Sequence, residues 1–150
     1  MNIADLKKEG YSISTDTGKL ELKFIHDYLY KSYWSEEIPI NIVKKSIQGS
    51  LCFGVYQGSR QVGFARMITD RATFAYLADV FIDEGHRGKG LSKWLMETIM
   101  SHPELQGLRR ILLATRDAHS LYHPFGFKPL DRPESIMQFH IPGIYKKKKQ

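Results

Sequence analysis

Apolar residues recur along the chain with two spacings, one typical of helices and one typical of strands. Steps of three to four residues place Leu20, Phe24 and Tyr28 on one side of a predicted helix that ends near Lys31. Side-chain oxygens at residues 15–17 are suited to cap its beginning. A Gly at position 49 closes a second helix. The predicted helices are residues 15–31, 40–47, 91–100 and 118–125.

Alternating or continuous apolar runs predict strands between these helices. The predicted strands are residues 11–15, 51–56, 62–69, 73–82, 110–115 and 135–141. The run at 73–82 is the most apolar and predicts a central strand that is buried on both faces. Short turns before it indicate an antiparallel meander. The order strand, glycine loop, helix, strand over 73–115 predicts a parallel pair of buried strands. The expected class is α/β, a mixed sheet with helices on its faces.

Length and composition limit the partners. The 150 residues fit a single domain, 1–150, with no apolar run long enough to cross a membrane. The first residues lack the apolar run of a secretory signal, so we expect a cytoplasmic protein. The net charge is +6, and without the four lysines of the tail it falls by four to +2. We expect the basic tail, 146–150, to be disordered and no nucleic acid to bind.

The sequence offers little for a disulfide or a metal. Cys52 is the single cysteine, so it has no partner within the chain. His119 and His123 are four residues apart and can share a helix face, but two histidines without a third ligand make a poor metal site. We therefore expect no metal.

The loop that opens the helix at 91–100 carries the clearest chemical signal. Closely spaced glycines let main-chain N–H groups converge, and the first N–H groups of a helix lack intrahelical partners. Such a place binds phosphate or diphosphate. Two basic side chains add positive charge at its rim. The expected phosphate-binding residues are Arg87, Gly88, Lys89, Gly90, Leu91 and Ser92.

Two common phosphate loops do not fit this segment. A nucleotide P-loop requires a lysine after its last glycine, and Leu91 stands there after Gly90. A dinucleotide fingerprint requires a third glycine, and Lys93 stands in its place. The strand before the loop is also not the first in the chain.

Two segments together resemble the GNAT superfamily of acetyl-CoA-dependent N-acetyltransferases. The segment VFIDEGHRGKGLS resembles motif A of that family, with Arg87 and Gly90 matching and Ser92 standing where Gly or Ala is preferred. The segment LLATRDAHSLYHPFGF resembles motif B, with Tyr122 four residues before Gly126. The resemblance covers residues 11–141. It implies a mostly antiparallel sheet in which one parallel pair splays apart to bind coenzyme A.

The resemblance also implies an activity and its residues. The chain is expected to move an acetyl group from acetyl-CoA to a primary amine, most simply of a small molecule, by direct attack in a ternary complex. Tyr122 would protonate the departing thiolate as general acid. The lone Cys52 is expected to be structural, which disfavours an acetyl-cysteine intermediate. The residues expected along the pantetheine arm are Val80, Phe81, Ile82, Thr115 and Ala118, although Thr115 replaces a frequent Asn.

The general base and the acceptor site are predicted from position. Asp79 is an acid in an apolar strand beside the expected slot, and a structural carboxylate is an equal interpretation. Asp117 and His119 are second choices for the base. Tyr33 and Trp34, with acids at positions 36 and 37, suit a cationic acceptor. Two further residues, Arg66 and Asp70, are expected to line the cleft.

Three other interpretations stay open. In the first, the acceptor is a protein N-terminus or lysine rather than a small amine. In the second, the fold is a non-catalytic acyl-CoA-binding module, against which the intact Tyr122 argues. The lysine tail alone suggests a nucleic-acid-binding protein. Because dimers are frequent in the GNAT family, a homodimer is expected.

Overall fold

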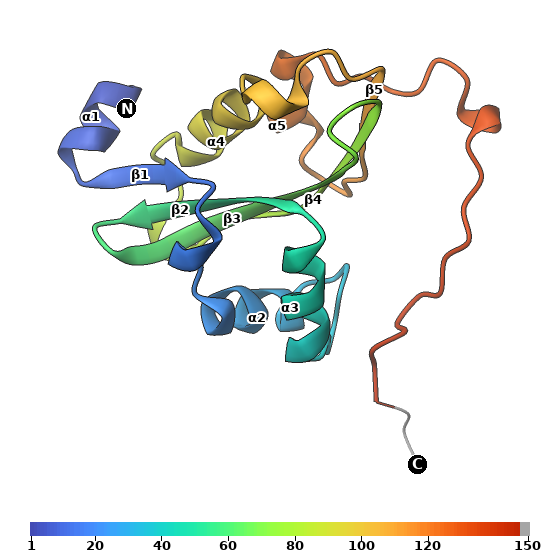
Figure 1. Ribbon diagram of the computed structural model, residues 1–150, viewed down its shortest axis with the longest axis horizontal. Helices are drawn as coiled ribbons and strands as arrows, with labels where there is room; N and C mark the ends of the chain where they lie inside the picture. The colour runs from blue at the N-terminus through green and yellow to red at the C-terminus, as the bar shows by residue number, and fades with distance from the viewer. Residues whose placement is uncertain (148–150) are drawn as a thin grey trace.

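The computed structural model describes residues 1–147 as a five-stranded sheet with helices on both faces (Figure 1). The helices are α1 (Ile3–Lys8), α2 (Leu22–Lys31), α3 (Ile40–Gln48), α4 (Leu91–Met100) and α5 (His119–Tyr122). The strands are β1 (Tyr11–Ser14), β2 (Leu51–Gln57), β3 (Arg60–Thr69), β4 (Phe74–Ile82) and β5 (Arg110–Leu113). No helix within residues 1–147 is long and apolar enough to cross a membrane.

The strands lie in the order β1-β2-β3-β4-β5, and every neighbouring pair is antiparallel except β4 and β5. This confirms the predicted meander and the parallel pair joined through α4. Residues 110–115 were expected to form a buried strand, but β5 is less buried than that. Because β5 forms the edge of the sheet, its side chains are half-buried or exposed.

Two apolar clusters cover the two faces of the sheet. The helices α4 and α5 lie over one face, and α2 and α3 lie over the other (Figure 1). Alternation along the strands divides neighbouring residues between the clusters, so Phe53 joins the α4 side and Cys52 the α2–α3 side. Both side chains are at most 2% exposed. The layers therefore follow from the period-two pattern of the strands.

A β-bulge interrupts β4 where the chain reaches the predicted site. Phe64 pairs with Phe81 and Arg66 with Ala78, so one residue of β3 lies opposite both Asp79 and Val80. Asp79 adopts a left-handed backbone conformation, with φ of 57°. A bulge bends its strand. The pairing of β4 with β5 ends just before it, at Leu77 and Leu113, while β4 continues to Ile82.

Both chain ends differ from the predictions. The first helix, α1, was not expected from its polar sequence; its single buried residue, Leu6, docks it on the core. Asp16 caps a short 3-10 turn, and α2 begins only at residue 22. The predicted strand at 135–141 was wrong, because those residues pair with no strand among those described. Of the expected disordered tail, Lys146 and Lys147 contact Glu36 and Glu37, and residues 148–150 lie outside the described part.

Candidate active site

An open cleft of about 1560 Å³ lies where β4 and β5 part. The ends of both strands and the segments that follow β5 and α2 form its walls. Part of the chain after residue 135 also lines it. Ten of the predicted site residues line it: Tyr33, Trp34, Arg66, Asp79, Val80, Arg87, Thr115, Asp117, Ala118 and Tyr122. The predicted phosphate-binding residues 88–92 are not among its lining residues. Two others, Phe81 and Ile82, direct their side chains into the core, and each is 4% exposed.

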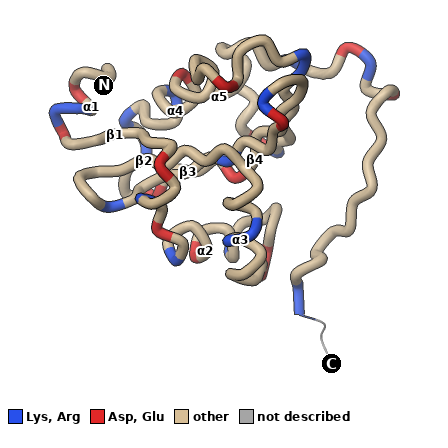
Figure 2. Tube along the Cα trace, viewed as in Figure 1, with Lys and Arg blue, Asp and Glu red and all other residues tan. Residues whose placement is uncertain are grey.

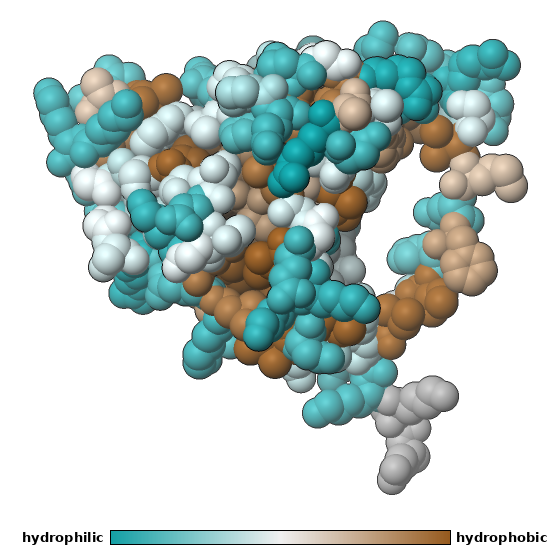
Figure 3. All heavy atoms as spheres, viewed as in Figure 1, coloured by the Kyte–Doolittle hydropathy of each residue, from teal (hydrophilic) through white to brown (hydrophobic). Residues whose placement is uncertain are grey.

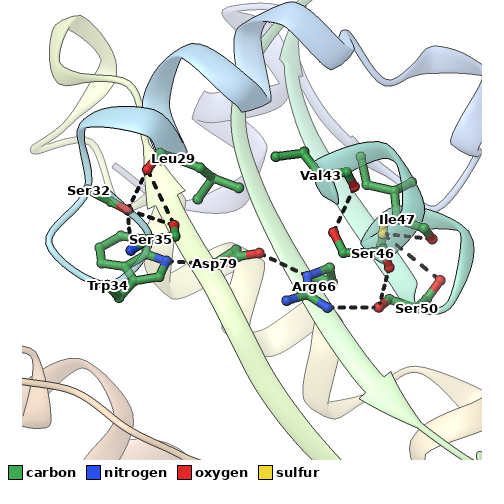
Figure 4. Close-up of polar contacts among 11 residues, drawn as sticks. Leu29, Ser32, Trp34, Ser35, Val43, Ser46, Ile47, Ser50, Arg66 and Asp79 are labelled. Atoms are coloured by element: carbon green, nitrogen blue, oxygen red, sulfur yellow. Dashed lines mark hydrogen bonds and ion pairs between the residues drawn. The ribbon is translucent and has the colours of Figure 1, made fainter. Parts of the chain in front are cut away.

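Asp79 joins three parts of the molecule through its carboxylate. One oxygen, Oδ1, accepts a hydrogen bond from Trp34 Nε1 at 2.9 Å, and Oδ2 accepts one from Arg66 Nε at 2.9 Å (Figure 4). The guanidinium also donates to Ser50 Oγ at 3.1 Å. The ion pair between Asp79 and Arg66 is mostly buried. The bulge thus fixes the loop after α2 against β3 and the end of α3.

The side of the cleft formed by α2 and the loop after it is aromatic. Tyr28 stacks on Phe81 with ring centroids 3.8 Å apart, and Trp34 lies edge-on to Tyr33. The guanidinium of Arg116 sits over the ring of Tyr33 at 3.9 Å. The sequence interpretation missed Tyr28 and Arg116. In the sequence, Tyr28 looks like a residue on the packed face of a helix, and Arg116 looks like a surface charge after a strand. Their partners in the cleft come from distant segments, so no local pattern indicates them.

Tyr122 lies on α5 and reaches the cleft with its side chain largely buried. Its hydroxyl makes no hydrogen bond within residues 1–147. Burial raises the pKa of the Tyr122 phenol above its usual range, and the nearby Tyr33 raises it further. The phenol is therefore protonated at neutral pH and can donate to a group in the cleft.

The glycine loop presents unpaired main-chain amides. Gly88 and Gly90 have φ of 79° and 91°, a left-handed conformation that favours glycine. Gly90 also caps α4, and a Cβ there would lie 3.3 Å from the carbonyl oxygen of Met1. Within the described chain, the amides of residues 88–92 donate to no protein acceptor. They converge at the positive end of α4, which suits an anion.

The two basic side chains of the loop turn toward the protein. Arg87 donates from Nε to the carbonyl of Ile82 at 2.9 Å and from its guanidinium to the hydroxyl of Tyr28 at 3.0 Å. Lys89 pairs with Glu9 at 3.4 Å. Arg87 therefore ties the loop to the end of β4 and to the aromatic wall.

The remaining predicted residues have local partners. Thr115 accepts a hydrogen bond from the amide of Ala118 at 3.0 Å, and Asp117 lies 3.7 Å from Arg116 on the cleft wall. Asp70 does not line the cleft. Hydrogen bonds from Thr73 and the following amides hold it in the turn before β4 and lower its pKa. No group of three metal-ligating side chains occurs in the part of the chain described.

The comparisons agree with this geometry. A family model described as the acetyltransferase (GNAT) domain matches residues 48–129. A candidate acetyltransferase of Gibberella zeae is 32% identical over 135 residues, 75% of each chain. The crystal structure of a candidate GNAT-family acetyltransferase from Xanthomonas campestris pv. campestris is 49% identical, with a TM-score of 0.90 over 91% of this chain and 97% of that one.

A more distant structure shares the fold alone. It is a GNAT family acetyltransferase from Elizabethkingia anophelis with acetyl-CoA bound, at 12% identity and a TM-score of 0.63 over 82% of this chain and 79% of that one. The family model covers more than half of the chain, and the Gibberella zeae relative exceeds 30% identity over three quarters of it. This chain belongs to the GNAT family of acetyltransferases.

Proposed function

We propose that the chain transfers the acetyl group of acetyl-CoA to the primary amine of a small molecule, in a ternary complex and without a covalent enzyme intermediate. One observation carries the proposal. The buried, protonated phenol of Tyr122 lines the cleft, and the free amides of residues 88–92 follow directly after Arg87, which lines another wall. Family membership supplies the acetyl-transfer chemistry.

Coenzyme A fits the main chain of this cleft. The amides of residues 88–92 suit its diphosphate, since they are unpaired and lie at the start of α4. Beyond Leu77 the edge of β4 that faces β5 has no strand partner. It is free to pair with the amides of an extended pantetheine arm. The inward side chain of Phe81 leaves its main chain for this contact, whereas the carbonyl of Ile82 already accepts from Arg87. Thr115 and Ala118 form the opposite wall.

Tyr122 is the proposed general acid. When the amine attacks the thioester carbonyl, the C–N bond forms and the C–S bond breaks. The phenol donates its proton to the departing thiolate. The pKa raised by burial keeps the proton available throughout the neutral range. The hydroxyl has no competing protein partner among the described residues.

Asp79 is the proposed base on the acceptor side. Each carboxylate oxygen accepts more than one hydrogen bond, so Asp79 retains capacity toward an amine although Trp34 and Arg66 already donate to it. Asp117 on the facing wall is the second choice, with the exposed His119 after it. The aromatic rings of Tyr33 and Trp34 provide faces for the carbon skeleton of the amine.

The test is an acetylation assay that reads release of free thiol over a panel of small amines and short peptides. We expect small amines to be acetylated. Tyr122→Phe is expected to lower kcat by about a hundredfold, since general acid catalysis contributes at least that factor. The same variant keeps its affinity for acetyl-CoA, measured by calorimetry.

Tyr30→Phe is the control, because Tyr30 lies on α2 against His26 and does not line the cleft. Unchanged turnover in Tyr122→Phe would remove the acid assignment. Acetylation of peptides alone would overturn the small-molecule acceptor. Binding of acetyl-CoA without acetylation of any amine would favour a non-catalytic acyl-CoA-binding module.

A further inference from the structure

Three side chains of the glycine loop and of the 3-10 turn before it are held by partners from distant parts of the chain. His86 forms a hydrogen bond with Tyr11 of β1, and Arg87 is tied to β4 and α2. Lys89 pairs with Glu9, which follows α1. These side chains therefore turn toward the body of the protein, while the amides after Arg87 stay unpaired within the described chain.

Tyr11 contacts the segment on both sides of Gly88. Its hydroxyl lies 2.7 Å from Nδ1 of His86, and the two rings meet edge to face with centroids 5.7 Å apart. The ammonium of Lys89 lies over the face of the same tyrosine ring, 5.6 Å from its centroid. Tyr11 is 3% exposed and belongs to the core on the α4 side of the sheet. A rigid residue of the sheet thus supports the loop.

The turn between α1 and β1 supplies the second support. Basic and acidic residues follow one another along α1 and this turn (Figure 2), and Glu9 pairs with Lys89 at 3.4 Å. The carbonyl of Glu9 accepts a hydrogen bond from Gln57 Nε2 at 3.2 Å. The carbonyl of Gly10 accepts one from the amide of Gly58 at 3.0 Å. The turn is therefore fixed against the hairpin of β2 and β3.

Apolar burial contributes little to this corner of the molecule. Leu6 is the single buried residue of α1. The surface over α1 and the neighbouring end of the sheet is mostly hydrophilic (Figure 3). The polar contacts of Tyr11 and Glu9 are therefore the main link between this corner and the loop.

We propose that Tyr11 is a positioning residue for coenzyme A, which fixes the loop through His86 and so holds the amides of residues 88–92 ready for the diphosphate. The inference rests on the proposed function, because it requires those amides to receive the coenzyme. Tyr11 does not line the cleft, so it acts on coenzyme affinity and not on the transfer of the acetyl group. A loop that is fixed before binding loses less conformational entropy when the ligand arrives.

Tyr11→Phe tests the proposal, because it removes the hydroxyl and keeps the ring in the core. The dissociation constant for acetyl-CoA, measured by calorimetry, is expected to rise about threefold to tenfold, as for the loss of one hydrogen bond. The KM for acetyl-CoA should rise by a similar factor, with kcat unchanged at saturation. Tyr56→Phe is the matched control. Tyr56 is also 3% exposed, but its hydroxyl has no partner among the described residues, so the variant should bind acetyl-CoA like the wild type.

A double-mutant cycle with His86→Ala tests whether Tyr11 acts through His86. His86→Ala alone should weaken binding by a similar factor, and adding Tyr11→Phe should then have no further effect, because the two residues share one contact. A general loss of stability would not produce this coupling. Equal affinity of the wild type and Tyr11→Phe would overturn the inference, as would fully additive effects in the cycle or an equal loss in Tyr56→Phe. A wild-type protein that does not bind acetyl-CoA would instead overturn the proposed function.

Discussion

The bulge at Asp79 lines the cleft and the loop at residues 88–92 follows the lining residue Arg87, but the two treat their polar groups in opposite ways. At the bulge, both oxygens of the Asp79 carboxylate have protein donors, and Arg66 is nearly covered. In the loop, the amides of residues 88–92 have no protein acceptor. Both places contain left-handed backbone, which is strained for Asp79 and easy for Gly90.

The difference separates a fixed wall from a binding surface. The hydrogen bonds to Asp79 hold the loop with Trp34 in one place, so this wall of the cleft is preorganised before any ligand arrives. Unpaired amides at a helix start are stable because water reaches them, and an anion replaces that water with a stronger contact. Mutations at the bulge should therefore lower the free energy of unfolding, whereas mutations in the loop should lower the affinity for the ligand.

The largest effect is expected from Asp79→Ala. Removing the carboxylate leaves Arg66 mostly buried without its partner, which we expect to lower the free energy of unfolding by about 3 kcal/mol. Asp79→Gly loses the same pair but relieves the left-handed backbone. It should be about 1 kcal/mol more stable than the alanine variant. Urea denaturation measures both.

Asp131→Ala is the control for that prediction, because its pair with Lys128 is exposed. It should leave the urea midpoint unchanged. Equal stability of the wild-type and Asp79→Ala proteins would mean that the bulge is not held by its ion pair.

The next effect is expected on ligand affinity from Gly90→Ala. A Cβ at φ of 91° is strained and lies close to the Met1 carbonyl, so the loop must shift. Loss of one amide contact to a charged group reduces affinity by about 10- to 100-fold. Calorimetry with acetyl-CoA measures it. Gly107→Ala also has a positive φ, with open space around it and no place in the loop, so it should keep the wild-type dissociation constant.

The smallest effect concerns Cys52 of β2, which lies opposite Arg66 on the neighbouring strand β3. Burial raises the pKa of the Cys52 thiol from 9.0 to about 11, with Arg66 opposing and Asp79 adding to the shift. The folded protein therefore holds this proton more tightly than the unfolded chain. The stability it contributes is complete below pH 9.0 and is lost as the pH rises through about 11.

We therefore expect the urea midpoint of the wild type to fall between pH 8.5 and pH 11 by more than that of Cys52→Ala, as estimated from this titration window. The alanine variant is less stable below pH 9.0, because it leaves a small cavity, but it lacks this titration. If the urea midpoints of the wild type and of Cys52→Ala fall equally with pH, the Cys52 thiol is accessible to water and its pKa is not raised in the folded protein.

The sequence predicts the local parts of this fold well. Apolar periodicity gives α2, α3, α4 and the strands β2 to β5, since each buries one stripe or face. It misses α1, where Leu6 alone is buried and tertiary contact supplies the stability. It also assigns a strand to residues 135–141. The alternation is present there, but strand formation requires a neighbour, which a local pattern does not specify.

The site is predicted to a similar degree. Motif B places Tyr122 and Thr115, and the position in the strand places Asp79, on one cleft, as the structure shows. They do not predict that Arg87 turns toward Tyr28, because that contact joins segments almost sixty residues apart. Side-chain direction in the loop depends on this distant partner, whereas main-chain direction depends on the local glycines. The catalytic and binding roles of these residues remain proposals.

The bulge also changes which residues of β4 face each side of the sheet. Before it, the odd-numbered residues Ala75 and Leu77 join the α4 side of the core. After it, the even-numbered Ile82 joins that side, and Phe81 lies on the opposite side. The apolar run is thus two short strands of opposite parity joined by one extra residue. Deleting that residue would merge them, turn Phe81 out of its layer and let β4 continue alongside β5, which closes the space between them.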